Sequence, residues 1–328
     1  MPVQITIIGL GQVGASIGMA LAQHKDIVST VGHDIELAVE HAALKKSAVE
    51  KTEHNLPKAV KDARIVLLAL PVHQVRETLE FIAPDLMDGT VVIDTAPVKS
   101  EVAKWAQELL PDGCYYVGLV PTVGPEFLHE TGTGLDSAKA DLFSKSIFLV
   151  DAPPGAPGEA VELASNLVQL LGATAMLTDI VESDGLMASV HLLPQLVSAA
   201  LLNATVDQPG WKDTRKLAGR AYIAATSALT AQDDPDSLRM LALHNRDNVS
   251  HSLNRMIAAL QTLRDDIEKG NDEGVKNRLQ AAQEGRTNWL DERTSANWVE
   301  MQREPADYPS TSERLFGGLI GRRTKNKK

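Results

Sequence analysis

The sequence predicts an α/β domain built on a parallel sheet, followed by an all-helical domain. Over the first 180 residues, short β-branched apolar runs alternate with segments of helical periodicity, the order expected of repeated βαβ units. From about residue 181 onward the strand signals stop, and apolar residues recur three and four positions apart. A length of 328 residues leaves room for two domains.

The first domain is expected to contain seven strands and five helices. Strands are predicted at residues 5–8, 30–34, 63–70, 89–94, 115–118, 146–150 and 174–178, and helices at 15–23, 36–45, 72–81, 99–110 and 160–171. The run 63–70 is almost wholly apolar, as is typical of a strand covered by helices on both faces. We place this domain at residues 1–180.

The second domain is expected at residues 181–290, with helices over 185–203, 212–231, 238–269 and 272–284. The apolar segment 185–204 is long enough to suggest a membrane span, but it carries His191, Pro194, Gln195 and Asn203. We therefore interpret it as a helix buried between packed neighbours. Residues 291–328 are expected to form a polar extension with a basic tail.

Three glycines directly after the first strand give the first functional signal. Gly9, Gly11 and Gly14 have G-x-G-x-x-G spacing, and Asp34 ends the second predicted strand. In a Rossmann-like dinucleotide-binding domain, these glycines permit a tight turn, close approach to a pyrophosphate and close helix packing. A carboxylate at position 34 would accept the ribose hydroxyls and repel a 2′-phosphate, so NAD is favoured over NADP. The alternative is a structural glycine turn with a surface aspartate.

Composition limits the remaining function classes. The net charge is −11, yet residues 314–328 carry six basic side chains and no acid, so the rest of the chain carries −17. A body this acidic argues against nucleic-acid binding, and the tail is interpreted as a disordered end or a contact for an acidic partner or neighbouring subunit. A single cysteine and the absence of a leader pattern favour a cytoplasmic protein, not a membrane protein. Without a cysteine cluster or H-E-x-x-H, no metal is expected.

Several blocks together resemble the prephenate and arogenate dehydrogenase family over about residues 3–270. They are the glycine turn, Leu70-Pro71-Val72, Asp94-x-x-x-Val98-Lys99, Gly118-x-x-Pro121-x-x-Gly124 and the helix from Asp184 to Pro194. The resemblance implies NAD(P)-dependent oxidation and decarboxylation of prephenate or arogenate in tyrosine biosynthesis, with the helical domain as dimerisation and substrate domain of a homodimer. We assign the cofactor site to Gly9, Gly11, Gln12, Val13, Gly14, Asp34, Leu70, Pro71 and Thr95.

The chain departs from the family where the resemblance implies catalytic groups. Pro97 stands at the position of a serine, Val120 at that of the histidine which takes the hydroxyl proton, and Gln195 at that of a second histidine. Neither valine nor proline can accept a proton. The alternatives are a non-catalytic dinucleotide-binding relative or a β-hydroxyacid-type dehydrogenase that uses Lys99.

Three other residues are therefore candidates for catalysis on a small carboxylic acid. His191 is spaced to share a helix face with Asp184 and Gln195, so it could act as a base whose tautomer is fixed by Asp184 or by a carbonyl group. Lys99 could bind a substrate carboxylate or act as an acid or base, and Thr122 could hydrogen-bond a substrate oxygen. The competing interpretations are a core histidine, a solvated lysine in a first helical turn and a threonine that organises a turn.

Overall fold

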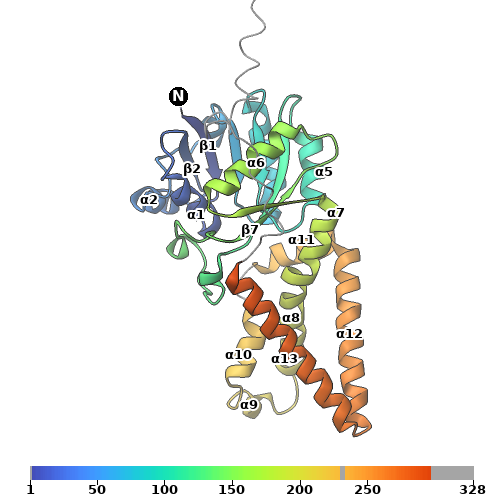
Figure 1. Cartoon of the computed structure of the whole chain (residues 1–328). Coiled ribbons are helices and arrows are strands. Elements are labelled where there is room, and N and C mark those ends of the chain that lie inside the picture. The colour runs from blue at the N-terminus through green and yellow to red at the C-terminus, as the bar shows by residue number, and fades with distance from the viewer. Residues whose placement is uncertain (1, 230–232, 297–328) are drawn as a thin grey trace, which may run out of the picture.

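The computed structural model describes residues 2–229 and 233–296. A sheet flanked by helices forms one part, and a group of long helices extends from its lower side (Figure 1). The strands are β1 (Val3–Ile8), β2 (Val28–His33), β3 (Lys51–Thr52), β4 (Ile65–Leu68), β5 (Val91–Asp94), β6 (Tyr115–Pro121), β7 (Ile147–Asp151) and β8 (Thr174–Thr178).

The strand order is β3-β2-β1-β4-β5-β6-β7-β8. All neighbouring strands pair in parallel except β6 and β7, which are antiparallel. The order reverses between β1 and β4, the point at which doubly wound sheets bind nucleotides. The predicted fold class, a Rossmann-like domain followed by helices, is confirmed.

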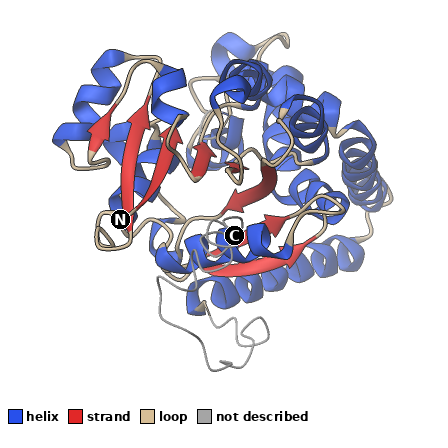
Figure 2. Ribbon diagram, turned by 90° about the horizontal axis from the view of Figure 1, so that it is seen from above, coloured by secondary structure: helices blue, strands red, loops and turns tan. Residues whose placement is uncertain are grey.

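Helices cover both faces of this sheet (Figure 2). They are α1 (Gln12–Leu21), α2 (Leu37–Lys45), α3 (Leu56–Val60), α4 (Val72–Ile82), α5 (Ser100–Leu109) and α6 (Gly158–Leu170). Successive side chains of β4 enter different cores, since Ile65 and Leu67 join the cluster under α1 and α6, whereas Val66 and Leu68 join the one under α4 and α5. This two-sided burial explains the apolar run in the sequence. The short β3 and α3 were not predicted.

The helical part contains α7 (Ile180–Met187), α8 (Leu193–Thr205), α9 (Trp211–Thr214), α10 (Arg220–Thr226), α11 (Pro235–His244), α12 (Arg246–Glu268) and α13 (Asp272–Ser295). A π-helical segment, η4 (Ala188–Leu192), joins α7 to α8 in place of the bend expected at Pro194. The predicted helix over 238–269 is divided at Asn245, whose φ of −112° and ψ of 31° are not helical. The predicted boundary at residue 290 falls within α13, and the basic tail lies outside the described residues.

The apolar run from α7 to α8 is only partly covered by the chain itself. Ile180–Thr205 is long and apolar enough to cross a membrane, and 28% of its most apolar window is buried. One such helix is weak evidence for a membrane span, because core helices share this composition. Within one chain the expected burial between neighbours is therefore incomplete. Large apolar side chains of the helical part are exposed, including Val190, Ile257, Leu260 and Ile267.

Candidate active site

The predicted cofactor residues lie together at the carboxyl edge of the parallel strands. The glycine turn follows β1, Asp34 follows β2, Leu70 and Pro71 lie just beyond β4, and Thr95 follows β5. Since parallel strands end at one edge of a sheet, these segments surround the point at which the strand order reverses. Thr95 is tied to this edge because its backbone N–H donates to Leu68 O at 3.0 Å.

The glycine turn has the backbone geometry that an anion site requires. Gly9 has φ +91°, and a Cβ there would lie 2.4 Å from Ala69 O. A Cβ on Gly14 would lie 2.0 Å from Gly9 O, so α1 packs against the turn more closely than any side chain allows. In front of Gly11 a Cβ would meet nothing within 4 Å, and no side chain caps the N-terminus of α1. An open helix N-terminus beside an accessible backbone suits a pyrophosphate.

Asp34 is held in place by backbone groups on both sides. Its Oδ2 accepts the Leu10 N–H at 2.8 Å, and its Oδ1 accepts the Glu36 N–H at 3.0 Å. A carboxylate can accept about four hydrogen bonds, so each oxygen keeps one acceptor position. Two remaining positions match the two hydroxyls of a ribose. The residues present therefore fit a dinucleotide.

Gln12 and Val13 form the first turn of α1. Gln12 Nε2 donates to Ser137 O at 3.3 Å, which joins this turn to the segment between β6 and β7. Val13 packs against the apolar cluster beneath α1. Both residues therefore fix the orientation of the helix N-terminus.

Lys99 lies in a buried polar junction between the two parts of the chain. Its side chain has no solvent exposure, and its Nζ donates to Asp94 Oδ2 at 2.8 Å. The Tyr116 hydroxyl donates to the other oxygen of Asp94 at 2.6 Å, and burial raises the pKa of Tyr116 well above its usual value. A buried, paired lysine at the start of α5 differs from the solvated residue that was one interpretation, and its pairing with Asp94 leaves no place for a substrate carboxylate. A role of Lys99 as an acid or base stays a prediction.

Asp184 belongs to the same junction and does not orient His191. Its Oδ1 accepts the Lys99 N–H at 2.6 Å and its Oδ2 accepts the Ser100 N–H at 3.1 Å, so a carboxylate of α7 caps α5. This corrects the predicted face of Asp184, His191 and Gln195. The π-helical segment changes the helical phase after Met187, and it turns the later two residues away from Asp184.

Asp151, at the end of β7, completes this junction. It is fully buried, and its Oδ2 accepts a hydrogen bond from the Ser183 hydroxyl at 3.0 Å. Burial raises its pKa to about 7, against the opposing charge of Lys99 and the bond from Ser183. The nearby carboxylates of Asp94 and Asp184 contribute to this rise.

His191, in the π-helical segment, pairs with a different acid from the one expected. Its Nε2 lies 2.7 Å from Asp233 Oδ2, and Gln195 Nε2 donates to the same oxygen at 2.9 Å. Burial raises the pKa of Asp233. The hydrogen bond and charge of His191 and the hydrogen bond from Gln195 outweigh the effect of burial, so the pKa of Asp233 is lowered. An ionised carboxylate only accepts, so His191 carries its hydrogen on Nε2 and its lone pair on Nδ1. The side chains of His191 and Asp233 are 20% and 18% exposed, so the pair is reachable from solvent.

The histidine segment shares an apolar cluster with part of the first domain. Ala188 and Leu192, on either side of His191, belong to the same apolar cluster as Val72 and Ala96, which follow β4 and β5. The sequence identified His191 but not Asp233, because 42 residues separate them and only the fold brings them together. The run Asp-Asp-Pro before α11 indicated a helix start, and nothing in it indicated a histidine partner.

The remaining candidate, Thr122, directly follows the end of β6. Thr122 Oγ1 donates to Ile147 O at 2.7 Å, so its hydroxyl joins the end of β6 to β7, and its contact with a substrate oxygen stays a prediction. Val120, at the family's histidine position, is buried against Leu149 and Met187.

Arg293 of α13 reaches the same end of β6, a contact that sequence reasoning missed. Its Nη2 donates to Thr122 Oγ1 at 3.2 Å and to Val123 O at 2.7 Å. Burial lowers the pKa of this arginine. In Figure 1 the upper end of α13 lies under the sheet-containing part of the molecule.

Comparison with known proteins agrees with this arrangement. Residues 17–177 match the model of the prephenate dehydrogenase nucleotide-binding domain, and residues 181–281 match that of the prephenate dehydrogenase dimerization domain. The prephenate dehydrogenase of Bacillus subtilis is 26% identical over 273 residues, or 83% of this chain and 72% of that protein. The cyclohexadienyl dehydrogenase of Zymomonas mobilis is 24% identical over 263 residues, or 79% of this chain and 87% of that protein.

A solved structure extends the likeness to the whole fold. The prephenate dehydrogenase from Aquifex aeolicus, in complex with hydroxyphenyl propionate and NAD+, superimposes with a TM-score of 0.78 at 19% identity. The alignment covers 88% of this chain and 98% of that one. Two consecutive domain models, curated relatives and this fold agree with the motifs read from the sequence. The chain therefore belongs to the prephenate dehydrogenase family, a family of NAD-dependent dehydrogenases.

Proposed function

We propose that this protein is a cytoplasmic, homodimeric dehydrogenase that oxidises and decarboxylates prephenate or arogenate with NAD. Family membership supports the reaction class, and the names of the Bacillus and Zymomonas relatives support a cyclohexadienyl acid as substrate. The dimerization-domain match and the exposed apolar side chains of α7, η4 and α12 support the homodimer. A second copy would cover the apolar run that one chain leaves exposed.

The cofactor site is proposed to hold NAD between the glycine turn and Asp34. Bound NAD+ would supply the hydride acceptor. The N-terminus of α1 would hold the pyrophosphate, and the two remaining acceptor positions of Asp34 would take the ribose hydroxyls. A 2′-phosphate would meet the Asp34 carboxylate, so we expect NADP to bind more weakly.

The observation that carries the proposed chemistry is the pair His191–Asp233. Asp233 accepts the Nε2 hydrogen and holds the imidazole, so Nδ1 is the atom that can take a proton. In the reaction, hydride leaves the ring carbon that bears the hydroxyl, and the hydroxyl proton passes to Nδ1. The ring carboxylate then leaves as CO2, its electron pair makes the ring aromatic, and the proton returns to the phenolate oxygen. His191 would thus replace the base that Val120 cannot provide.

Arg293 donates to Thr122 and Val123 at the end of β6, so its positive charge would lie beside a substrate carboxylate bound there. Lys99 cannot take this role while it is buried against Asp94, which argues against the β-hydroxyacid alternative.

The test is NADH formation with prephenate, arogenate and a set of β-hydroxyacids. We expect turnover of a cyclohexadienyl substrate, and a kcat loss of roughly 10²- to 10⁴-fold in His191→Asn with little change in NAD binding. His129→Asn, an exposed histidine outside the site, is the matched control. Cofactor binding with no turnover of any acid would instead support a non-catalytic relative.

A further inference from the structure

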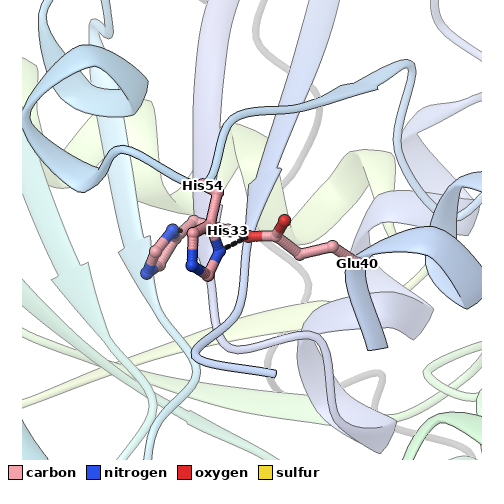
Figure 3. Close-up of side chains that lie close together, drawn as sticks. All are labelled: His33, Glu40 and His54. Atoms are coloured by element: carbon pink, nitrogen blue, oxygen red, sulfur yellow. Dashed lines mark hydrogen bonds and ion pairs between the residues drawn. The ribbon is translucent and has the colours of Figure 1, made fainter. Parts of the chain in front are cut away.

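Beside the proposed ribose site lies a cluster of three ionisable side chains that the reaction does not use. His33 ends β2, Glu40 lies on α2, and His54 follows β3 (Figure 3). Their nearest ligand-type atoms all lie within 4.8 Å of one another. Glu40 is almost completely buried, whereas the side chain of His54 is half exposed.

Glu40 is the centre of this cluster, and its Oε1 contacts Asp34 directly. The backbone N–H of Asp34 donates to Glu40 Oε1 at 3.0 Å. His54 Nδ1 lies 3.2 Å and His33 Nδ1 3.5 Å from the same oxygen. One buried carboxylate oxygen therefore joins the backbone of the ribose-binding residue to two imidazoles.

The hydrogen positions favour a hydrogen-bonded cluster over a metal site. His33 Nδ1 also lies 3.1 Å from Glu53 O, which can only accept a hydrogen bond. Because both neighbours of this nitrogen are acceptors, it carries a hydrogen and has no lone pair for a cation. The same geometry makes His54 Nδ1 a donor to Glu40.

We propose that Glu40 is a positioning residue for cofactor discrimination, acting through Asp34; this rests on the proposed NAD site. Asp34 has three fixed contacts: Leu10 and Glu36 hold its carboxylate, and Glu40 holds its backbone. Asp34 lies between β2 and α2, so Glu40 supplies the contact that fixes the backbone from which the carboxylate extends. The two imidazoles orient Glu40 in turn. Loss of Glu40 would loosen Asp34 and leave two imidazoles without their carboxylate partner beside the proposed ribose site.

The experiment measures the dissociation constants of NAD and NADP by titration of protein fluorescence, independently of turnover. In Glu40→Ala we expect NAD binding to weaken about tenfold, as for loss of a hydrogen bond to a charged group, and NADP binding to weaken less or improve. The preference for NAD over NADP therefore falls, while kcat at saturating NAD stays within about twofold because no reacting group has changed. Glu40→Gln keeps an acceptor for the Asp34 N–H and is expected to recover part of the NAD affinity.

Two further variants keep the test decisive if Glu40→Ala fails to fold. His54→Ala removes a half-exposed partner of Glu40 and is expected to lower the same preference by a smaller factor. His41→Ala, the next residue on α2 and exposed, is the matched control. An unchanged preference in both Glu40→Gln and His54→Ala would overturn the proposal, as would tight Zn²⁺ binding that His54→Ala abolishes. Failure of the wild-type protein to bind NAD would instead reject the cofactor site itself.

Discussion

Replacement of Asp151 by asparagine should stabilise the protein in a pH-dependent way. The folded-state pKa of Asp151 is raised to about 7 from an ordinary value of 3.8, chiefly by burial. Between these two values the folded state holds a proton that the unfolded state has lost, so stability falls as pH rises from about 4 to 7. At 1.36 kcal/mol per pKa unit, the cost of ionising Asp151 reaches about 4 kcal/mol at pH 7 and does not grow further.

Asparagine imitates the protonated acid and keeps an oxygen for the Ser183 hydroxyl. The free energy of unfolding, from urea titrations followed by circular dichroism at pH 5, 6, 7 and 8, should therefore diverge between the two proteins. Asp151→Asn should gain about 1.6 kcal/mol at pH 5 and about 4 kcal/mol at pH 8. Asp112→Asn, at an exposed aspartate, is the control and should stay within about 0.5 kcal/mol throughout. A difference between wild type and Asp151→Asn that does not change from pH 5 to pH 8 would refute the reasoning.

Two other predictions concern the buried junction that contains Asp184 and the end of β6 that is proposed to bind the substrate. Asp184→Ala removes both capping bonds from α5 and the contact with α7, and should lower the free energy of unfolding by about 2 kcal/mol, measured by urea titration. The comparison is Asp179→Ala, which removes the cap of α7 itself. A loss at position 184 that is equal to or smaller than the loss at position 179 would contradict a role of Asp184 at the junction. Arg293→Ala should raise KM for the carboxylic acid about tenfold or more and leave the KM for NAD unchanged, as steady-state kinetics would show. Equal changes in both constants would mean that Arg293 acts only on the structure of the β6 end.

Local rules were sufficient for the sheet and its cofactor edge. Neighbouring residues determine the β-branched run of β1, the tight turn at Gly9 and the close packing at Gly14. The strand, the turn and the helix could therefore be predicted from the sequence. The apolar run 63–70 likewise predicted β4, and β8 was predicted with its observed bounds, 174–178. The short β3 and α3 were missed because two residues of strand carry no periodic signal.

The helical part and the reacting groups depend on contacts that spacing does not reveal. Asn245 interrupts a periodic apolar pattern because its side chain donates to Asp184 O at 2.7 Å. His191 was expected to share a face with Asp184, yet an α-helical wheel cannot represent the π-helical segment between them. Lys99 lies at a helix start that is normally exposed, and only the packing of α7 over it produces burial.

The π-helical segment η4 fixes how α8 is rotated relative to α7, so the number of residues between these helices matters for the proposed site. In an α-helix each residue turns the chain by about 100° and advances it by about 1.5 Å. Deleting one residue from 188–192 would restore a regular helix and change the rotation of α8 relative to α7. The change would disturb the contact of Gln195 with Asp233. An insertion or deletion of a single codon outside His191 would thus alter the contacts of the proposed His191–Asp233 pair.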